Sequence, residues 1–244
     1  MNDVFLMDCL EGMKNIPDKS VDFILTDPPY DVNYGEKSSV LARLDKAREK
    51  QIERDESFQD VAPDYNSVSA ELYRVLKDNS HVYLFCGGRQ LPKWMESMHS
   101  AGFKEPQILT WKKNITTFDI TFGHFFPFNS EFILFFQKGW KRLNVENVDR
   151  TRFKSVLTFN SSRDTGYHSC AKPINLLMFL TRLSSNEGDV CLDPFSGSGN
   201  HLIAFKRCKR RYIGFEVSSV YHATILRRLK AEETQKTVEF YEKL

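Results

Sequence analysis

The sequence has no long apolar run. Among its 244 residues, no stretch approaches the roughly 18 consecutive apolar residues that a membrane-spanning helix needs. The first residues, MNDVFLMD, also lack a basic region followed by an apolar stretch, so we expect no secretory signal. We therefore expect no membrane partner.

Cysteine is scarce and scattered. The chain has five cysteines, and no two of them form a CxxC pair. Because zinc sites and disulfide frameworks need regularly spaced cysteines, we expect neither of them, no bound metal, and a cytoplasmic location. The five are Cys9, Cys86, Cys170, Cys191 and Cys208.

An excess of charge of one sign is missing as well. The 34 basic and 32 acidic residues leave a net charge of +2, which does not indicate a nucleic-acid binder. Two local clusters are basic, one between Lys138 and Lys154 and one, KRCKRR, between Lys206 and Arg211. Solvated surface remains the alternative interpretation of both clusters.

Short apolar runs alternate with helical patterns along the whole chain. This alternation is typical of an α/β protein with a largely parallel sheet. The expected strands are VFLM (4–7), VDFILT (21–26), HVYLFC (81–86), QILTW (107–111), EFILFF (131–136), DVCLD (189–193) and RYIGFE (211–216). The expected helices cover 8–16, 66–77, 89–101, 173–185, 199–208 and 218–232.

Two long connections interrupt the alternation. The first, about 31–62, is dense in charge of both signs, and we expect a mobile loop or helical insertion there. The second covers 114–167 apart from the EFILFF strand. Connections of this length usually serve function or are disordered, and ligands of open parallel sheets bind at the carboxyl ends of the strands.

The stretch LTDPPY closes an apolar strand with an acid and two prolines. Proline pairs are rare inside strands, because each proline removes a backbone donor. The chain must therefore leave its sheet at Asp27. A carboxylate, a backbone without donors and the Tyr30 ring then lie together at the sheet edge.

A second turn, in DVCLDPFSGSGN, is rich in glycine. Gly197 and Gly199 allow a ligand to approach the main chain closely. Leu202 occupies the place of the third glycine of a dinucleotide fingerprint, and the GK[ST] ending of a phosphate loop is absent. Glu216 ends the next strand, where an acid accepts hydrogen bonds from ribose hydroxyls. These features favour S-adenosylmethionine over NAD or ATP.

Together the two motifs resemble those of the DNA amino-methyltransferases, which methylate N6 of adenine or N4 of cytosine. The DPPY half precedes the glycine-rich half, as in the circularly permuted β class of that family. The resemblance covers the chain from Asp8 to the final helix. It implies a single catalytic domain, 1–244, with an α/β, Rossmann-like, circularly permuted fold and a seven-stranded, mostly parallel sheet. It further implies S-adenosyl-L-methionine as cofactor and double-stranded DNA as partner, and it leaves a homodimer and a paired restriction enzyme open.

The resemblance also implies the cofactor site. Phe195, Gly197 and Gly199 match the FxGxG loop, and Glu216 matches the acid that holds the ribose. YHSCAKP (167–173) agrees with the HPTQKP-like segment at three positions only. The implied cofactor residues are Asp8, Cys9, Asp27, His168, Lys172, Pro173, Asp193, Pro194, Phe195, Ser196, Gly197, Ser198, Gly199 and Glu216. Ser169, Cys170 and Ala171 depart from the family pattern, and Asn200 stands where a threonine is common.

The implied catalytic residues are Asp27, Pro28, Pro29 and Tyr30. An exocyclic amine is a poor nucleophile, so two acceptors, the Asp27 carboxylate and the Pro28 carbonyl, would draw its lone pair out of the ring. The Tyr30 ring would stack on a base flipped out of the duplex.

The target base is the open question at this stage. In the family, an aspartate at the first motif position goes mostly with adenine, which favours N6-adenine over N4-cytosine. No cysteine follows a proline, which disfavours methylation at cytosine C5. An RNA methyltransferase and an inactive nucleic-acid binder remain alternatives. A protein-glutamine enzyme and a nicotinamide oxidoreductase are disfavoured by Asp27 and by the missing third glycine.

The resemblance also implies a target-recognition region before the HPTQKP-like segment, at about 139–166. Its basic side chains would mostly contact DNA phosphates. The candidates are Lys141, Arg142, Arg150, Arg152, Lys154 and Arg163.

Overall fold

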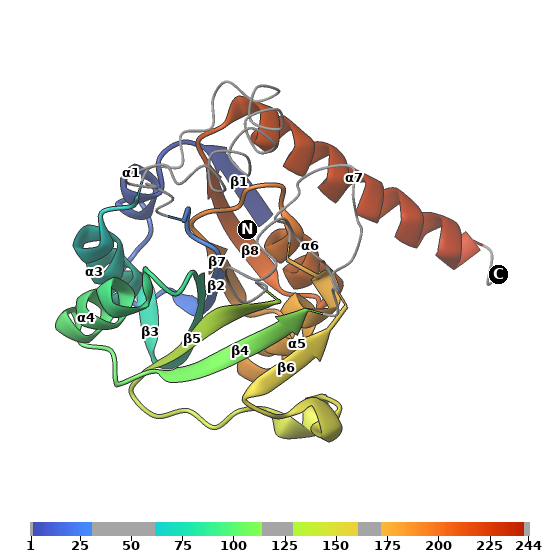
Figure 1. The fold of residues 1–244 in the computed structure, drawn as a ribbon. Coiled ribbons are helices and arrows are strands. Elements are labelled where there is room, and N and C mark those ends of the chain that lie inside the picture. The colour runs from blue at the N-terminus through green and yellow to red at the C-terminus, as the bar shows by residue number, and fades with distance from the viewer. Residues whose placement is uncertain (1, 31–61, 114–128, 161–171, 242–244) are drawn as a thin grey trace, which may run out of the picture.

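A sheet of eight strands forms the middle layer of the protein, and helices cover both of its faces (Figure 1). The computed structural model describes residues 2–30, 62–113, 129–160 and 172–241, with the side chains of the last helix described as far as Glu233. Within these residues the strand order is β1-β8-β7-β2-β3-β5-β4-β6.

The strands are β1 (Asn2–Leu6), β2 (Val21–Thr26), β3 (Leu76–Cys86), β4 (Gln107–Lys113), β5 (Ser130–Lys138), β6 (Val156–Phe159), β7 (Val190–Asp193) and β8 (Arg211–Glu216). The helices are α1 (Cys9–Met13), α3 (Tyr65–Val75), α4 (Leu91–Ala101), α5 (Ile174–Ser184), α6 (Asn200–Arg207) and α7 (Ser219–Tyr241). Two 3₁₀ turns, η1 (Val145–Asn147) and η2 (Arg150–Arg152), precede β6.

The α/β fold with a mostly parallel sheet is confirmed, but the expected strand count of seven is wrong. The additional strand, β6, lies inside the predicted recognition region and, among the described strands, pairs with β4 only. It has only four residues, whose side chains alternate between exposed and buried, and polar residues surround it. A strand this short gives a weak pattern in the sequence. The sequence also predicts the start of β3 five residues too late, at His81 rather than Leu76.

One strand differs in direction from the others. β5 pairs antiparallel with both β3 and β4, whereas every other pairing in the sheet is parallel. The beginning of β5 therefore lies at the edge where the other strands end. Ser130 pairs with Lys112 near the end of β4, and Phe132 pairs with Cys86 at the end of β3.

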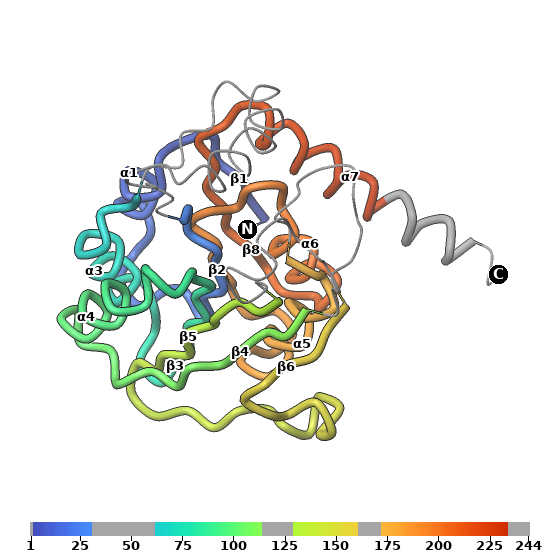
Figure 2. Tube along the Cα trace, viewed as in Figure 1, coloured from blue at the N-terminus to red at the C-terminus, as the bar shows by residue number. Residues whose placement is uncertain are grey.

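The chain path agrees with the predicted circular permutation. β1, near the amino terminus, pairs along its length with β8, which precedes the final helix (Figure 2). β8 in turn pairs with β7, and β7 pairs with β2. The glycine-rich turn after β7 and the DPPY turn after β2 therefore emerge from neighbouring strands, although they are far apart in the sequence.

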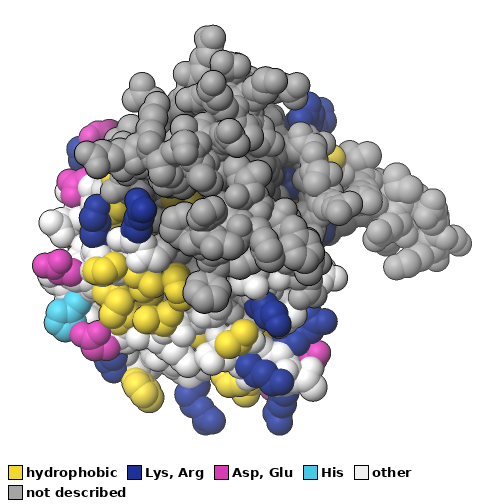
Figure 3. Space-filling model, in the orientation of Figure 1, with side chains coloured by type: hydrophobic (Ala, Val, Ile, Leu, Met, Phe, Trp, Pro, Cys, Tyr) yellow, Lys and Arg dark blue, Asp and Glu magenta, His cyan; other side chains and the backbone are white. Residues whose placement is uncertain are grey.

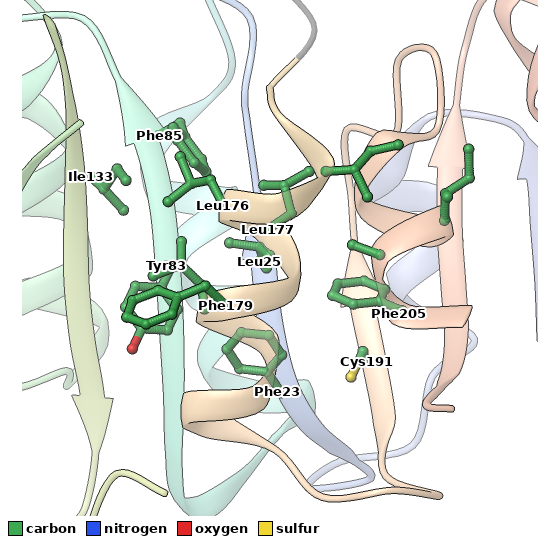
Figure 4. Packing of buried hydrophobic residues seen from close by; sticks show 14 of the residues in the cluster. Phe23, Leu25, Tyr83, Phe85, Ile133, Leu176, Leu177, Phe179, Cys191 and Phe205 are labelled. Carbon is green, nitrogen blue, oxygen red and sulfur yellow. The ribbon is translucent and has the colours of Figure 1, made fainter. Parts of the chain in front are cut away.

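The core consists of two apolar layers, one on each face of the sheet. On one face, Phe23 and Leu25 of β2 pack under α5 and α6 (Figure 4). On the other face, Ile24 packs with residues of α1, α3 and α4. All three side chains are fully buried, and each such burial contributes about 1.5–3 kcal/mol. None of the described helices combines the length and the apolar character needed to cross a membrane.

Candidate active site

The DPPY loop begins where β2 ends, at Thr26. The Asp27 carboxylate accepts two hydrogen bonds. Lys172 Nζ lies 2.5 Å from Oδ2, and the Tyr30 hydroxyl lies 3.0 Å from Oδ1. Burial, together with the negative charges of Asp27 and Glu131, raises the pKa of Tyr30 well above its ordinary value, so the phenol stays a hydrogen-bond donor.

Lys172 lies at the centre of a small charge network. Its side chain is almost completely buried, and its ammonium lies 3.2 Å from Glu131 Oε2 as well as beside Asp27. The ammonium also lies 5.2 Å from the centre of the Tyr30 ring and 5.3 Å from that of Phe85. A buried lysine of this kind needs compensating charge, and here two carboxylates share that role.

Glu131 has a second cationic partner. Lys113, at the end of β4, forms an ion pair with it. Burial opposes ionisation of Glu131, but the positive charges of Lys172 and Lys113 outweigh burial and lower its pKa. Glu131 and Lys113 were not predicted from the sequence. The only signal was a single acid at the start of the apolar strand EFILFF.

A buried glutamine is hydrogen-bonded to the same loop. Gln90 is 2% exposed, and its Nε2 donates to the Pro29 carbonyl at 2.9 Å and to the Tyr65 hydroxyl at 3.2 Å. Its Oε1 accepts from the Gly87 amide at 3.3 Å. Gln90 therefore connects the loop to α3 and to the end of β3. Gln90 was not predicted from the sequence, because no motif marks its position.

The glycine-rich loop is joined to the DPPY strand through Asp193. This residue is fully buried, and its Oδ1 accepts hydrogen bonds from Thr26 Oγ1 at 2.7 Å and from the Phe195 amide at 3.2 Å. His201 Nδ1 lies 3.0 Å from the other oxygen, Oδ2. Asp193 thus fixes the start of the loop Pro194–Phe195–Ser196–Gly197–Ser198–Gly199 against β2.

Glu216, at the end of β8, also binds the glycine loop. Its carboxylate accepts from the Gly197 amide at 2.7 Å and from the Ser218 amide at 2.8 Å. Desolvation raises its pKa although these two amides oppose the effect. Gly197 and Gly199 have φ of 50° and 88°, so both need the left-handed region, which glycine tolerates.

Three buried polar atoms beside the glycine loop have no hydrogen-bond partner within the described part of the chain. They are Asp193 Oδ2, which has a charge contact with His201, and Asn200 Oδ1 and His201 Nε2 in the first turn of α6. Asn200 Nδ2 donates to the Lys172 carbonyl at 2.7 Å, so this amide connects the glycine loop to the residue that binds Asp27. Unpartnered buried polar atoms need a ligand or water, and these three atoms are compatible with a polar ligand beside the glycine loop.

The remaining predicted cofactor residues have mixed surroundings. Asp8 is exposed and caps α1, accepting from the amides of Leu10 and Glu11. Cys9 is buried, and burial with the nearby Asp8 charge raises its thiol pKa to about 12, so it packs as an unreactive thiol. Pro173 precedes α5 instead of being its first residue. His168 lies outside the described residues, as do the departing positions 169–171.

The predicted DNA contacts lie away from the DPPY loop in part. Lys141 Nζ donates to the Ser184 carbonyl at the carboxyl end of α5, opposite the end near Lys172. Arg152 lies over the Phe159 ring at 5.0 Å. Arg142, Arg150, Arg152 and Lys154 are exposed, and basic side chains gather at the lower right of the face in Figure 3. Arg163 and the insertion at 31–61 lie outside the described residues, and a DNA role for these residues stays a prediction.

The chain is similar to known proteins over most of its length. Residues 21–227 match the family model of N6/N4 DNA methylases, described as DNA methylase. YubD of Escherichia coli (strain K12) is 31% identical over 224 residues, which cover 92% of this chain and 88% of YubD. The type II methyltransferase M2.DpnII of Streptococcus pneumoniae is 28% identical, with 92% of this chain and 88% of the relative covered.

Solved structures share the fold. The PvuII DNA methyltransferase, which is specific for cytosine N4, superposes with a TM-score of 0.72 at 16% identity, over 92% of this chain and 85% of the other. The complex of M1.HpyAVI with S-adenosylmethionine gives a TM-score of 0.66 at 23% identity, over 93% and 100% of the two chains. At these identities the similarity concerns the fold alone.

Proposed function

Because the chain belongs to the N6/N4 DNA methylase family, we propose that it transfers a methyl group from S-adenosylmethionine to the N6 amino group of adenine in double-stranded DNA. The observation that carries this proposal is the position of Asp27. Its carboxylate is held by Lys172 and Tyr30 at the end of β2, beside the glycine loop that follows the neighbouring strand β7.

The chain offers groups for the ribose and for the methionine end of the cofactor. The Glu216 carboxylate lies at the end of β8, where it can accept from ribose hydroxyls. Asn200 Oδ1 is a buried acceptor without a partner, suited to the ammonium of the methionine end. S-adenosylmethionine supplies an electrophilic methyl group on a positively charged sulfur. The acidic and carbonyl groups around the loops suit that positive charge.

The DPPY loop prepares the amine for attack. The Asp27 carboxylate and the Pro28 carbonyl accept its two hydrogens and localise the lone pair on nitrogen. The new C–N bond forms as the S–C bond breaks, the bonding pair stays on sulfur, and the amine then loses a proton, which the Asp27 carboxylate can accept. The Tyr30 ring stacks on the flipped base, which recovers about 1–3 kcal/mol of the cost of unstacking.

The DNA duplex is the partner we propose for the exposed basic residues of 139–166. Four of them are exposed and can reach phosphates, namely Arg142, Arg150, Arg152 and Lys154. The Lys141 ammonium already donates to a carbonyl at the end of α5, so we expect it to contribute less to DNA binding than the other basic residues.

N4-cytosine is the second candidate. The family includes both activities, and the PvuII enzyme that shares this fold is specific for cytosine N4. Asp27 at the first motif position favours adenine by the family pattern. The two products differ in mass and retention, so one assay distinguishes them.

The decisive experiment is nucleoside mass spectrometry on unmethylated genomic DNA incubated with the protein and S-adenosylmethionine. We expect N6-methyladenine from the wild type and none from Asp27→Ala, because that variant lacks the acceptor for the amine. N4-methylcytosine would keep the mechanism and overturn the base assignment. Absence of both products on DNA, with methylation of structured RNA, would move the proposal to an RNA substrate.

A further inference from the structure

Asp27 already binds two donors before any substrate enters. Lys172 Nζ lies 2.5 Å from Oδ2, and the Tyr30 hydroxyl lies 3.0 Å from Oδ1. The proposed reaction asks the same carboxylate to accept a hydrogen from the target amine. Each carboxylate oxygen can accept more than one hydrogen bond, but every added donor withdraws negative charge that the amine needs.

Both donors have a second acceptor within reach, and it is the same atom. Glu131 Oε2 lies 3.2 Å from Lys172 Nζ and 3.4 Å from the Tyr30 hydroxyl. The Glu131 and Asp27 side chains are similarly accessible, at 20% and 19%. Lys113 binds Glu131 from its other side and holds it in place. The four charged groups balance, because two carboxylates face two ammonium groups.

We propose that Glu131 is a positioning residue for methyl transfer, because its Oε2 accepts the Tyr30 hydroxyl and shares Lys172 when the target amine enters, leaving Asp27 Oδ1 free to accept the amine hydrogen. The inference rests on the proposed function. A rotation of the phenol hydroxyl and a small shift of its oxygen convert the 3.4 Å approach into a hydrogen bond.

The direct test is single-turnover methyl transfer by Glu131→Gln on unmethylated genomic DNA. The amide oxygen is a weaker acceptor than the carboxylate, so Asp27 keeps both donors. Because a hydrogen bond to a charged group is strong, we expect a rate about tenfold lower or more. Apparent KM values for DNA and S-adenosylmethionine should change less than about threefold, since Glu131 acts on the reacting step.

A double-mutant cycle with Tyr30→Phe separates this role from a purely structural one. Without the hydroxyl, Asp27 has one competing donor fewer, so Tyr30→Phe should retain most of the activity. In that background Glu131→Gln should lower the rate about threefold or less. An equal loss in both backgrounds would overturn the proposal, because Glu131 would then act independently of Tyr30.

Glu71→Gln is the matched control. Glu71 has a side-chain exposure of 23% and an ion pair with Arg74, but it lies on α3 away from the site. Its replacement should leave the rate unchanged.

If Glu131→Gln does not fold, a double variant with Glu131→Gln and Lys113→Gln removes one charge of each sign. It is measured against Lys113→Gln alone. Full activity of the folded variant overturns the inference alone, whereas an inactive wild type overturns the proposed function with it.

Discussion

At the scale of single residues, the catalytic loop depends on side chains outside its own motif. We propose that Asp27, Pro28, Pro29 and Tyr30 carry the chemistry, and Gln90 holds the Pro29 carbonyl through a partly buried hydrogen bond. The same amide also binds Tyr65 and Gly87. Because the proline pair has no amide donors of its own, the loop relies on such an external donor to hold its carbonyl in one orientation.

Replacing Gln90 with methionine tests this dependence. Gln90→Met keeps the length of the side chain but leaves the Pro29 carbonyl and the Gly87 amide unpaired. We expect unfolding in urea to require about 1–3 kcal/mol less free energy, together with a lower rate of methyl transfer. Gln107→Met, at an exposed position of β4, should change neither quantity. Equal stability of Gln90→Met and the wild type would contradict the assigned role.

At the scale of elements, the direction of β5 determines the composition of the site. Glu131 is the second residue of this strand, and only the antiparallel direction brings it to the edge where β2 and β3 end. In a parallel strand the same residue would lie at the opposite edge, far from Asp27. An apolar run such as EFILFF predicts a strand, but its pattern contains no information about the direction.

The two loops of the site could be predicted from the sequence, but most of the residues that hold them in place could not. The DPPY and FSGSG turns could be found because glycine, proline and an acid at a strand end have local conformational reasons. Lys172 could be found through its partial match to a family motif. Glu131, Lys113 and Gln90 come from three other elements, and only the tertiary fold brings them to Asp27. β6 was missed because four residues between polar turns give too short a pattern.

Gly199 and Gly188 provide a matched test of the glycine-rich turn. Both have positive φ, 88° and 85°, so alanine is strained to a similar extent at either position. A Cβ on Gly199 would lie 3.0 Å from Ile225 Cγ1, whereas a Cβ on Gly188 would meet nothing within 4 Å. We expect Gly199→Ala to lose about 1–3 kcal/mol more stability than Gly188→Ala and to weaken binding of S-adenosylmethionine. Calorimetric titration and urea unfolding measure both effects. Equal losses in the two variants would show that Ile225 moves aside.

At the scale of the whole molecule, basic residues that look like a nucleic-acid patch in the sequence serve the fold in part. In the run 206–211, Arg207 pairs with Glu232 and Lys206 with Glu233, both on α7. Arg210 is buried and binds Ser185 at the end of α5. This run therefore joins α6 to α7 and the start of β8 to the end of α5, which leaves the exposed residues of 139–166 as the better candidates for DNA.

The start of that recognition region is fastened to the core by a buried histidine. His81 of β3 is fully buried, and its two ring nitrogens lie 3.0 Å from Ser184 Oγ and 3.1 Å from the Lys141 carbonyl. Burial lowers its pKa from the ordinary 6.5 to about 4, so the folded protein keeps the ring neutral. The protein's global stability must therefore depend on pH.

The sign of this dependence follows from proton uptake. As the pH falls below 6.5, His81 becomes protonated in the unfolded chain. In the folded protein it becomes protonated only near pH 4. The neutral His81 therefore contributes its full stabilisation above pH 6.5. As the pH falls from 6.5 to 4 the free energy of unfolding decreases, by about 1 kcal/mol at pH 5.5 and by about 3 kcal/mol at most.

In His81→Gln the amide stays neutral at every pH and can bind both partners. Urea unfolding at pH 7.5 and 5.5 should show a smaller loss in the variant than in the wild type. Lost packing against Phe135 would lower the variant's stability equally at both pH values, so the difference between the two losses isolates the proton. Identical losses would mean that His81 is already protonated in the folded protein.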